Sequence, residues 1–548
     1  MERLGPRRAV VGALSAGITL GMLALAWQVL AAGGWTLPEA LILLCLAANA
    51  PWLGLAAATA LAGLAIRLLV PDPAALVLPA LRRAGGPVRD RTLLAVCVRL
   101  EDMDAVVPPF ARLLRDLRAA HGDRFALAIL SDTPAGEAAE DEAAAVAALA
   151  ARFPEGAVLY RRRAENAGFK AGNLMDFLDR HAAGYHHALV LDADSAMSAE
   201  AVARLVRAMQ ADPGLAILQS AIAGRGAETR FSRLYGFGLR HGARVWTTGQ
   251  AWWQGPEQLW WGHNALVRID AFRRHARLPL LPDGGRVLSH DYAEAAMLHA
   301  AGWAVRVLPE DAGSSERHPP DLPALFGRDL RWAAGNLQYR HLLRRPEFGR
   351  LGRFQMLEAA LHYALAPLRF AVLPLAALNA ATGGAEGTPR GALLLLLLLG
   401  FVVVTLPKLA GYAEALLRPG RAGRAALLRD MVQELALSLL LETLESLERT
   451  LSLMRLASGR YGGWAPQPRA ARAVTWAAAA RRFGWHSAAG LAMAGAFGAA
   501  GGFALSAALP ALAGLLLAVP LAVLTARPGA RVAAAAMSRP EDLRSPVG

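Results

Sequence analysis

The chain has 548 residues, 55% of them hydrophobic, and a formal net charge of +14. Its length exceeds one ordinary domain, and its hydrophobic fraction indicates a membrane protein. Nucleic acid is not an expected partner, because no nucleic-acid-reading motif accompanies the charge and arginines near membrane helices are its expected source. Two cysteines, Cys45 and Cys97, cannot form a disulfide framework. The soluble part is therefore expected in a reducing compartment.

Two uncharged apolar segments, 9–34 and 40–66, open the chain. Each is longer than the roughly 20 residues that a helix needs to cross a bilayer. Arginines precede the first segment and follow the second, and the link between them has no positive charge. The positive-inside rule then places the N-terminus and the block after residue 70 in the cytoplasm. Residues 1–70 are predicted to form two transmembrane helices.

Residues 71–350 have a different pattern, in which short apolar runs alternate with stretches of helical spacing. The runs read as buried strands, and the alternation predicts an α/β domain around a mostly parallel sheet. Ligands of such sheets gather at the carboxyl ends of the strands, where Asp132, Asp192 and Asp194 fall. The expected strands are 93–98, 125–130, 187–194 and 215–219, and the expected helices include 110–120 and 138–152.

The membrane pattern returns in residues 351–528, which are predicted to form a C-terminal helical bundle. An amphipathic helix at about 431–456, with Glu442, Glu445 and Glu448 along one face, is expected to lie in the membrane interface. The four C-terminal spans are 362–381, 392–406 with an extension to 417, 485–507 and 509–524. Together with the two N-terminal helices this gives six predicted spans. Both termini, including a C-terminal tail at 529–548, are then expected in the cytoplasm.

Carboxylates follow several of the predicted strands. Asp192 and Asp194, in the sequence LDADS, suit a divalent cation that neutralises a diphosphate, although such a pair can also be a solvated turn. Lys170 begins the sequence KAGN, which suits a nucleotide or simply starts a helix. Asp132, in SDT, could accept hydrogen bonds from a base or ribose, or cap the next helix. Glu101 and Asp102 carry the same two alternatives.

Two later motifs suit an acceptor sugar. Asp291, in SHD, could take the proton of an attacking hydroxyl, or cap a helix in a capping box with Glu294. In RDLRW, Arg331 suits diphosphate oxygens and Trp332 suits a sugar ring, with core packing as the alternative. A tryptophan-rich segment at 252–261 is interpreted as the lining of an acceptor groove in preference to a membrane-interface belt.

Taken in order, SDT, LDADS, SHD and RDLRW resemble the inverting glycosyltransferases of family 2, which have a GT-A fold. SHD and RDLRW stand where most of that family reads TED and QxxRW. These variants, together with GHNA at 262–265 and a late GWH segment, resemble the bacterial inner-membrane enzymes of osmoregulated periplasmic glucan synthesis. The end of the first strand, VRLED, departs from the Cys-Asn-Glu-Asp-like run of the family.

The resemblance implies residue roles and a cofactor. Asp291 corresponds to the catalytic base, and Asp192 and Asp194 correspond to the ligands of Mg²⁺ or Mn²⁺. The substrate contacts that it implies are Glu101, Asp132, Lys170, Asn173, Asp192, His263, Asn264, Arg328, Arg331 and Trp332.

The implied activity is polymerisation of glucose from UDP-glucose into a β-1,2-linked glucan, with export through the protein's own helices. Arg369 could border that path or snorkel to the interface. The other expected partners are the growing glucan, membrane lipid and a periplasmic protein that modifies the product. Two alternatives stay open: a synthase of another polymer such as cellulose, chitin or hyaluronan, and a non-catalytic UDP-sugar-binding transporter or scaffold.

Overall fold

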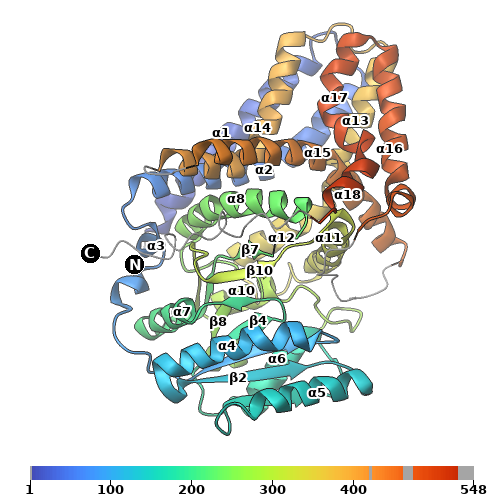
Figure 1. Cartoon of the computed structure of the whole chain (residues 1–548). Helices are drawn as coiled ribbons and strands as arrows, with labels where there is room; N and C mark the ends of the chain where they lie inside the picture. Colours follow the sequence, from blue (N-terminus) through green and yellow to red (C-terminus); the bar gives the residue numbers. More distant parts are fainter. Residues whose placement is uncertain (1–2, 227, 419–422, 461–472, 529–548) are drawn as a thin grey trace.

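The computed structural model describes residues 3–226, 228–418, 423–460 and 473–528. Figure 1 shows an α/β domain at one end of the molecule and a bundle of long helices at the other, with two helices lying across the junction. The predicted tail at 529–548 lies outside the described residues. The α/β domain carries the candidate site.

The α/β domain is built on a mixed sheet. Within the described residues this sheet has seven strands in the order β3-β2-β1-β4-β8-β6-β9. Strand β8 runs antiparallel to both of its neighbours, and the other pairings are parallel. The strands are β3 (Val158–Arg162), β2 (Phe125–Ser131), β1 (Thr92–Val98), β4 (His187–Asp192), β8 (Ala265–Arg268), β6 (Leu215–Ser220) and β9 (Ala304–Leu308). The prediction of a mostly parallel α/β sheet is confirmed.

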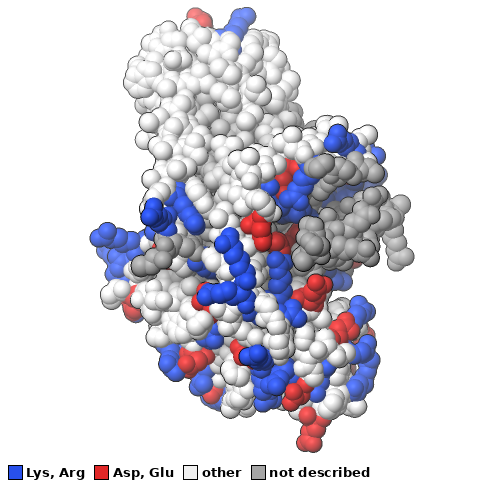
Figure 2. Space-filling view, turned by 90° about the vertical axis from the view of Figure 1, so that its left-hand side faces the viewer, with Lys and Arg blue, Asp and Glu red and all other residues white. Residues whose placement is uncertain are grey.

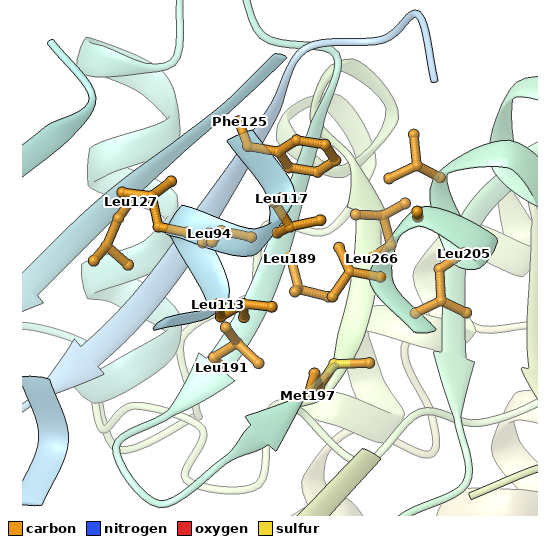
Figure 3. Packing of buried hydrophobic residues seen from close by; sticks show 14 of the residues in the cluster. Leu94, Leu113, Leu117, Phe125, Leu127, Leu189, Leu191, Met197, Leu205 and Leu266 are labelled. Atoms are coloured by element: carbon orange, nitrogen blue, oxygen red, sulfur yellow. The ribbon is translucent and has the colours of Figure 1, made fainter. Parts of the chain in front are cut away.

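Helices cover both faces of the sheet because buried side chains alternate along its strands. Leu94 and Val96 point to one face, where they pack with α4, α5 and α7, while Leu93 and Ala95 point to the other, where they pack with α6, α9 and α10. Figure 3 shows the first of these cores, with Leu94, Leu117 and Leu189 side by side. The helices are α4 (Met103–His121), α5 (Glu137–Ala150), α6 (Phe169–His181), α7 (Ala199–Ala211), α9 (Ile269–His275) and α10 (Asp291–Ala300).

A small second sheet lies beside the carboxyl edge of the main one. Its order is β5-β10-β7, with bounds Ala196–Met197, Ser314–Arg317 and Ala223–Arg225. Strand β5 begins two residues after Asp194, so the turn that carries Asp192 and Asp194 is held between two sheets. Shorter elements complete the domain: α3 (Pro73–Val77), η1 (Pro79–Arg83), η2 (Gly122–Arg124) and η3 (Gln338–His341).

The long helices at the other end agree with membrane spans. By length and hydropathy, four of the described helices qualify, counting α12 with α13 as one, and a fifth qualifies if α17 and α18, bent by 52°, are one span. Figure 2 shows that the upper part of the molecule carries almost no charged side chains, whereas lysines and arginines gather at its base. The helices are α1 (Leu4–Leu30), α2 (Leu37–Leu69), α12 (Arg350–Ala364), α13 (Ala366–Ala381), α14 (Arg390–Leu417), α17 (Gly502–Leu516) and α18 (Ala518–Thr525).

The sequence analysis counts six spans, and the difference is helix α16 (Trp476–Ala499). Its first turns carry Arg481 and Arg482, and its apolar part includes His486, so its hydropathy does not reach that of a span. The helix nevertheless packs beside α13 and α17 (Figure 1). The predicted boundary at residue 350 does not separate two parts that lie apart. Helix α12, which follows it, packs against α10 and α11 of the α/β domain, and the chain enters the helical bundle at α13.

Three helices form the junction between the two parts: α8 (Arg230–Gln254), α11 (Leu322–Leu337) and α15 (Arg424–Ala457). Helices α8 and α15 run across the direction of the long apolar helices (Figure 1). Helix α8 packs closely on α2, since a Cβ on Gly63 would overlap the Val245 carbonyl and a Cβ on Gly249 would overlap the Thr59 carbonyl. Paired glycines allow this backbone contact, which fixes the α/β domain against the membrane helices.

Candidate active site

Asp192 lies at the centre of a group of charged side chains at the carboxyl end of β4. The ammonium of Lys170, in the first turn of α6, forms an ion pair with Asp192 and donates a hydrogen bond to the Gly262 carbonyl at 2.8 Å. Burial disfavours the charged lysine, but the Asp192 carboxylate outweighs this effect and raises the pKa of Lys170. The structure thus brings together Lys170 and Asp192, which the sequence analysis proposed as donor contacts.

His263 lies on the other side of Asp192, with 4.0 Å between its Nδ1 and the Asp192 carboxylate. Both ring nitrogens face oxygen atoms, because Nδ1 is 3.0 Å from the Trp261 carbonyl and Nε2 is 2.7 Å from the Glu316 carboxylate. Burial opposes the charged ring, but Asp192 and Glu316 raise the pKa of His263 to about 9. Both ring nitrogens of His263 are therefore beside protein oxygens, and its contact with the substrate stays a prediction.

The turn around His263 is shaped by two residues with positive φ, Gly262 at +81° and Asn264 at +48°. Asn264 was predicted to contact the substrate, and in the structure its side chain points into the protein. Its side chain is fully buried and donates to the Ser314 hydroxyl at 3.0 Å, joining the turn to β10. A buried amide of this kind stabilises the turn, and its contact with the substrate stays a prediction.

Asp132 follows β2 and forms an ion pair with Arg163, whose second nitrogen donates to the same carboxylate at 2.9 Å. This arginine was not predicted from the sequence. It follows β3, which is parallel to β2 with Ser131 opposite Arg162. Asp132 and Arg163 are the next residues of the two strands, so their side chains start from neighbouring positions at the same edge of the sheet. Asp132 does not cap the next helix, since α5 begins at Glu137 with Gly136 before it. The pair places a carboxylate and a guanidinium at the edge where a nucleotide would bind.

Glu101 and Asp102 lie in the loop after β1, next to the SDT segment. The Leu100 amide, at a φ of +54°, donates to the Thr133 hydroxyl at 2.9 Å and ties the two loops together. Asp102 is the N-cap of α4 and accepts a hydrogen bond from the Asp104 amide. Asp102 therefore has the capping role, while Glu101 is half-buried beside it and stays a candidate contact.

Asn173 was also predicted to contact the substrate, and its side chain too points into the protein. Its side chain is 1% exposed and donates to the Leu130 carbonyl of β2 at 3.1 Å, on the inner side of α6. The hydrogen bond fixes α6, and with it Lys170, on the sheet. In this structure Asn173 therefore holds α6 in the position that places Lys170 in the site.

Replacing Asn173 with alanine should destabilise the protein without changing donor binding. The Leu130 carbonyl would lose its buried partner, which costs about 1–3 kcal/mol. Thermal unfolding in detergent should show a lower midpoint, while the KM for the donor stays within about twofold because no substrate contact is lost. Lys170→Ala, on the same helix, is expected to show the reverse pattern. A raised donor KM in Asn173→Ala without loss of stability would contradict this assignment.

Asp291 is the first residue of α10, and His290 precedes it as the N-cap. The predicted capping box with Glu294 is absent from this described helix, because Glu294 pairs with the His290 ring at 2.8 Å instead. Burial raises the pKa of Asp291, and the neighbouring His290 partly offsets the effect. A Cβ added to Gly262 would lie 3.8 Å from the Asp291 Cβ. Asp291 thus faces the Lys170–Asp192 group across a glycine.

Helix α11 carries the RDLRW residues and packs close to the SHD segment, where Ser289 lies against Gly335. Trp332 is 45% exposed, and the Arg328 guanidinium lies 4.5 Å from the centre of its ring. Arg328 also donates to the Tyr235 hydroxyl of α8 at 3.0 Å. Arg331 is half-buried on the same helix. The exposed indole is the free aromatic face that a sugar ring could contact.

A cavity of ≈ 110 Å³ lies beside Trp332 at the junction with the membrane helices. Arg449 of α15 reaches into its wall, pairing with Asp329 of α11 at 2.8 Å and with Glu445 at 3.1 Å. Glu448, predicted on the same face as Glu445, instead lies 2.8 Å from Arg482 of α16. The cavity is lined by Tyr235, Leu325, Phe326, Arg328, Asp329, Trp332, His362, Tyr363, Glu445 and Arg449.

The tryptophan-rich segment does not line this cavity. Trp260 is fully buried and packs edge-on against Phe272 and His290. Trp253 is buried against the first membrane helices, and the Arg7 guanidinium lies 5.7 Å from the Trp252 ring. Trp252, Trp253 and Trp260 thus contact other parts of the protein, and the interpretation of 252–261 as an acceptor groove stays a prediction.

The carboxylates at the end of β4 are the oxygen ligands that could hold a divalent cation. The described residues contain no group of three or more His, Cys, Asp or Glu side chains able to hold a metal. Asp192 and Asp194 are two carboxylates in one turn, and Mg²⁺ is commonly held by one or two carboxylates together with substrate phosphates and water. The two residues therefore fit an ion that arrives with a nucleotide diphosphate.

Comparison with known families agrees with this geometry. Residues 187–407, which run from β4 into α14, match the model of glycosyl transferase family group 2. A sheet of this topology with acidic side chains at its carboxyl edge, joined to apolar helices, defines a GT-A glycosyltransferase in an integral membrane protein.

Two curated relatives narrow the class. Glucans biosynthesis glucosyltransferase H of Caulobacter vibrioides (strain NA1000 / CB15N) is 34% identical over 529 residues, covering 90% of this chain and 78% of the relative. The protein of the same name from Xanthomonas campestris pv. campestris (strain B100) is 32% identical over 513 residues, covering 86% and 76%. The chain belongs to the glucans biosynthesis glucosyltransferase H family and is a hexosyltransferase.

Among solved structures, mannosyltransferase PcManGT from Pyrobaculum calidifontis, in complex with GDP-Man and Mn²⁺, is similar with a TM-score of 0.39 and 16% identity. The match covers 67% of this chain and 100% of that one.

Proposed function

We propose that the protein polymerises glucose from UDP-glucose into the β-1,2-linked backbone of an osmoregulated periplasmic glucan. The relatives' name supports glucose as the sugar and a glucan as the product. The observation that carries the proposal is the position of Asp291, which faces Lys170 and Asp192 across Gly262. A donor diphosphate beside Lys170 and an acceptor hydroxyl beside Asp291 would then meet at the sugar between them.

In the proposed reaction Asp291 accepts the proton of the acceptor hydroxyl as its oxygen attacks the anomeric carbon of the donor. The new glycosidic bond forms on the face opposite to the bond that breaks, so the anomeric configuration inverts. UDP leaves with the electron pair of the broken bond. Lys170 offers its ammonium to the departing diphosphate, and Asp132 with Arg163 holds the uridine portion.

Asp194, with Asp192 beside it, would hold Mg²⁺ or Mn²⁺, which supplies positive charge to the diphosphate when bound. Arg331 is proposed to contact the same diphosphate from α11, and Glu101 to contact the nucleotide from the loop after β1. These roles complete the donor side of the site.

Trp332 is proposed to seat the terminal sugar of the acceptor, stacked against its exposed ring. The cavity beyond it, with aromatic walls and the Asp329–Arg449 pair, would then receive the growing chain at the membrane boundary. Arg369 of α13 interacts electrostatically with Glu442 and Glu445 of α15, which extends the polar surface toward the bundle. Such groups are costly against lipid and favour a hydrated path, so we propose export of the glucan along it.

The charge distribution supports a proposed orientation in the membrane. Lysines and arginines gather at the base of the apolar bundle (Figure 2), which the positive-inside rule assigns to the cytoplasm. We therefore propose a bacterial inner-membrane protein with its catalytic domain and termini in the cytoplasm. A periplasmic protein that modifies the glucan is the proposed downstream partner.

The test of the proposed function is release of UDP by membranes or proteoliposomes that contain the purified protein. UDP-glucose should support release in the presence of Mg²⁺ or Mn²⁺, and other UDP-sugars should support it poorly. Linkage analysis of the product separates a β-1,2-glucan from cellulose, chitin or hyaluronan. Failure to release UDP from any UDP-sugar would leave the non-catalytic alternative standing. Export is tested in sealed inverted vesicles, whose catalytic domain faces the outside: with UDP-glucose added outside, the glucan should accumulate in the lumen.

A further inference from the structure

We propose that Glu142 of α5 is a positioning residue of the donor site and holds the loop after β1 in place through the hydroxyl of Thr133. No sequence motif includes Glu142, and no step of the proposed reaction uses it. The inference rests on the proposed function in one respect, because it takes the loops after β1 and β2 as the ones that contact the donor nucleotide.

Glu142 is a carboxylate on a face of α5 that is otherwise apolar. The buried residues of this helix are Ala139, Glu142, Val146 and Leu149, and Glu142 is only 2% exposed. A charged group in such a position is costly unless hydrogen bonds satisfy it, whereas an apolar side chain of the same size would have no such cost. The carboxylate is thus expected to serve the groups that donate to it.

Two hydroxyls donate to this carboxylate, one from the loop after β2 and one from β3. Thr133, directly after Asp132, donates to Oε2 at 2.7 Å, and Tyr160 donates to Oε1 at 3.0 Å. Because an ionised carboxylate only accepts, the proton of the Thr133 hydroxyl points toward Glu142. The lone pairs of the Thr133 oxygen are thereby turned toward other donors.

The donor that meets the Thr133 oxygen is the Leu100 amide, 2.9 Å away. Leu100 has a φ of +54°, in the left-handed region that a leucine rarely adopts, so surrounding contacts must hold the loop after β1 in this shape. Glu142 orients the Thr133 hydroxyl so that it can accept from this amide. A chain of hydrogen bonds therefore runs from Glu142 through Thr133 to Leu100.

This chain of hydrogen bonds controls the loop after β1 more than the loop after β2. The Asp132 amide donates to the Val98 carbonyl at 2.9 Å, so the sheet itself holds Asp132. Glu101 follows Leu100 directly, so its position depends on the shape of the loop after β1. Loss of the Glu142 carboxylate should therefore displace Glu101 while Asp132 stays in place.

The expected effect is on the donor alone. Glu101 is a proposed contact of the nucleotide, so its displacement should weaken donor binding. Helix α5 lies at the end of the α/β domain that is far from the apolar helices (Figure 1). Acceptor binding at Trp332, beside those helices, should not change.

The test combines two pairs of variants of nearly constant shape. Glu142→Met and Thr133→Val each remove one end of the hydrogen bond between the two side chains. Each should raise the dissociation constant for UDP and the KM for UDP-glucose about tenfold, the size expected when one hydrogen bond to a charged group is lost. The acceptor KM should stay unchanged. Glu142→Gln, which can offer an amide oxygen to Thr133, and Thr133→Ser, which keeps the hydroxyl, should each recover most of the loss.

The double variant and two controls separate positioning from stability. Glu142→Met combined with Thr133→Val should bind UDP no more weakly than Thr133→Val alone, because the chain to Leu100 is already broken. Tyr160→Phe removes the other hydrogen bond of the same carboxylate. It should lower the midpoint of thermal unfolding while the dissociation constant for UDP stays within about twofold. Glu140→Gln, at an exposed position on the same helix, should change neither quantity.

Unchanged donor constants in Glu142→Met or in Thr133→Val would overturn the inference. So would an equal rise in Tyr160→Phe, because the carboxylate would then act only by stabilising the fold. If Glu142→Met does not fold, the comparison of Thr133→Val with Thr133→Ser decides between the same outcomes. Absence of UDP binding by the unmodified protein would instead reject the proposed donor, so the two failures are distinguishable.

Discussion

Asp291→Asn is expected to lower glucose transfer by about 10³-fold, within the range that a positioned general base contributes. Asparagine has nearly the shape of aspartate and can stay at the first position of α10, but it cannot take the proton of the acceptor hydroxyl. The nucleotide contacts lie on the other side of Gly262, so the dissociation constant for UDP should change by less than about twofold. Radiolabelled glucose incorporation and UDP binding measured on the same preparation separate the two effects.

The pH dependence of the transfer rate is a second test of the role of Asp291. Asp291 acts in its ionised form, and burial raises its pKa above the ordinary value for aspartate, near 3.9. The rate should therefore fall on the acid side, beginning at a higher pH than an exposed aspartate would give, and the residual rate of Asp291→Asn should lack this limb. Asp270→Asn, in an exposed pair with Arg274 on α9, is the matched control and should behave like the unmodified protein. Transfer retained by Asp291→Asn would remove Asp291 from the mechanism.

The parts of the site that could be predicted from the sequence are those set by the sheet. Asp132 and Asp192 each come directly after a buried apolar run, and in a parallel sheet such positions meet at one edge. The strand register confirms this, with Cys97 of β1 opposite both Leu130 and Asp192. Arg163 could have been found by the same reasoning, since it follows β3 at the equivalent step. It was missed because β3 is short and less buried than its neighbours.

The parts that could not be predicted depend on which way a side chain points in a loop. Asn173 and Asn264 belong to motifs that suit a nucleotide, yet both amides turn inward to satisfy backbone or side-chain groups of a neighbouring strand. Glu316 reaches His263 over 53 residues, through a sheet whose strands are only two to four residues long. No periodicity marks a strand of that length, so a contact built on it has no signal in a single sequence.

The second large effect is expected for Asp194→Asn. Asp194 is the proposed ligand of the cation, whereas Asp192 beside it faces Lys170 and His263. Asparagine keeps an oxygen ligand in the turn but removes the negative charge. The concentration of Mg²⁺ or Mn²⁺ needed for half-maximal UDP release should rise at least about tenfold, and transfer at fixed metal should fall about 10²-fold, because charge stabilisation at the leaving group is the term affected.

A loss of metal binding in Asp194→Asn must be distinguished from a loss of stability. The main-chain carbonyl of Asp194 accepts a hydrogen bond from Arg225 of β7 at 3.1 Å, and that contact survives the substitution. Its carboxylate also interacts electrostatically with Arg225, so thermal stability measured with a chelator present gives the effect of the substitution on folding alone. UDP binding measured with the chelator should match that of the unmodified protein. Asp141→Asn, at an exposed position on α5, controls for a general loss of negative charge. An unchanged metal requirement in Asp194→Asn would mean that the ion is held elsewhere, and the two carboxylates after β4 would then serve only to orient Lys170.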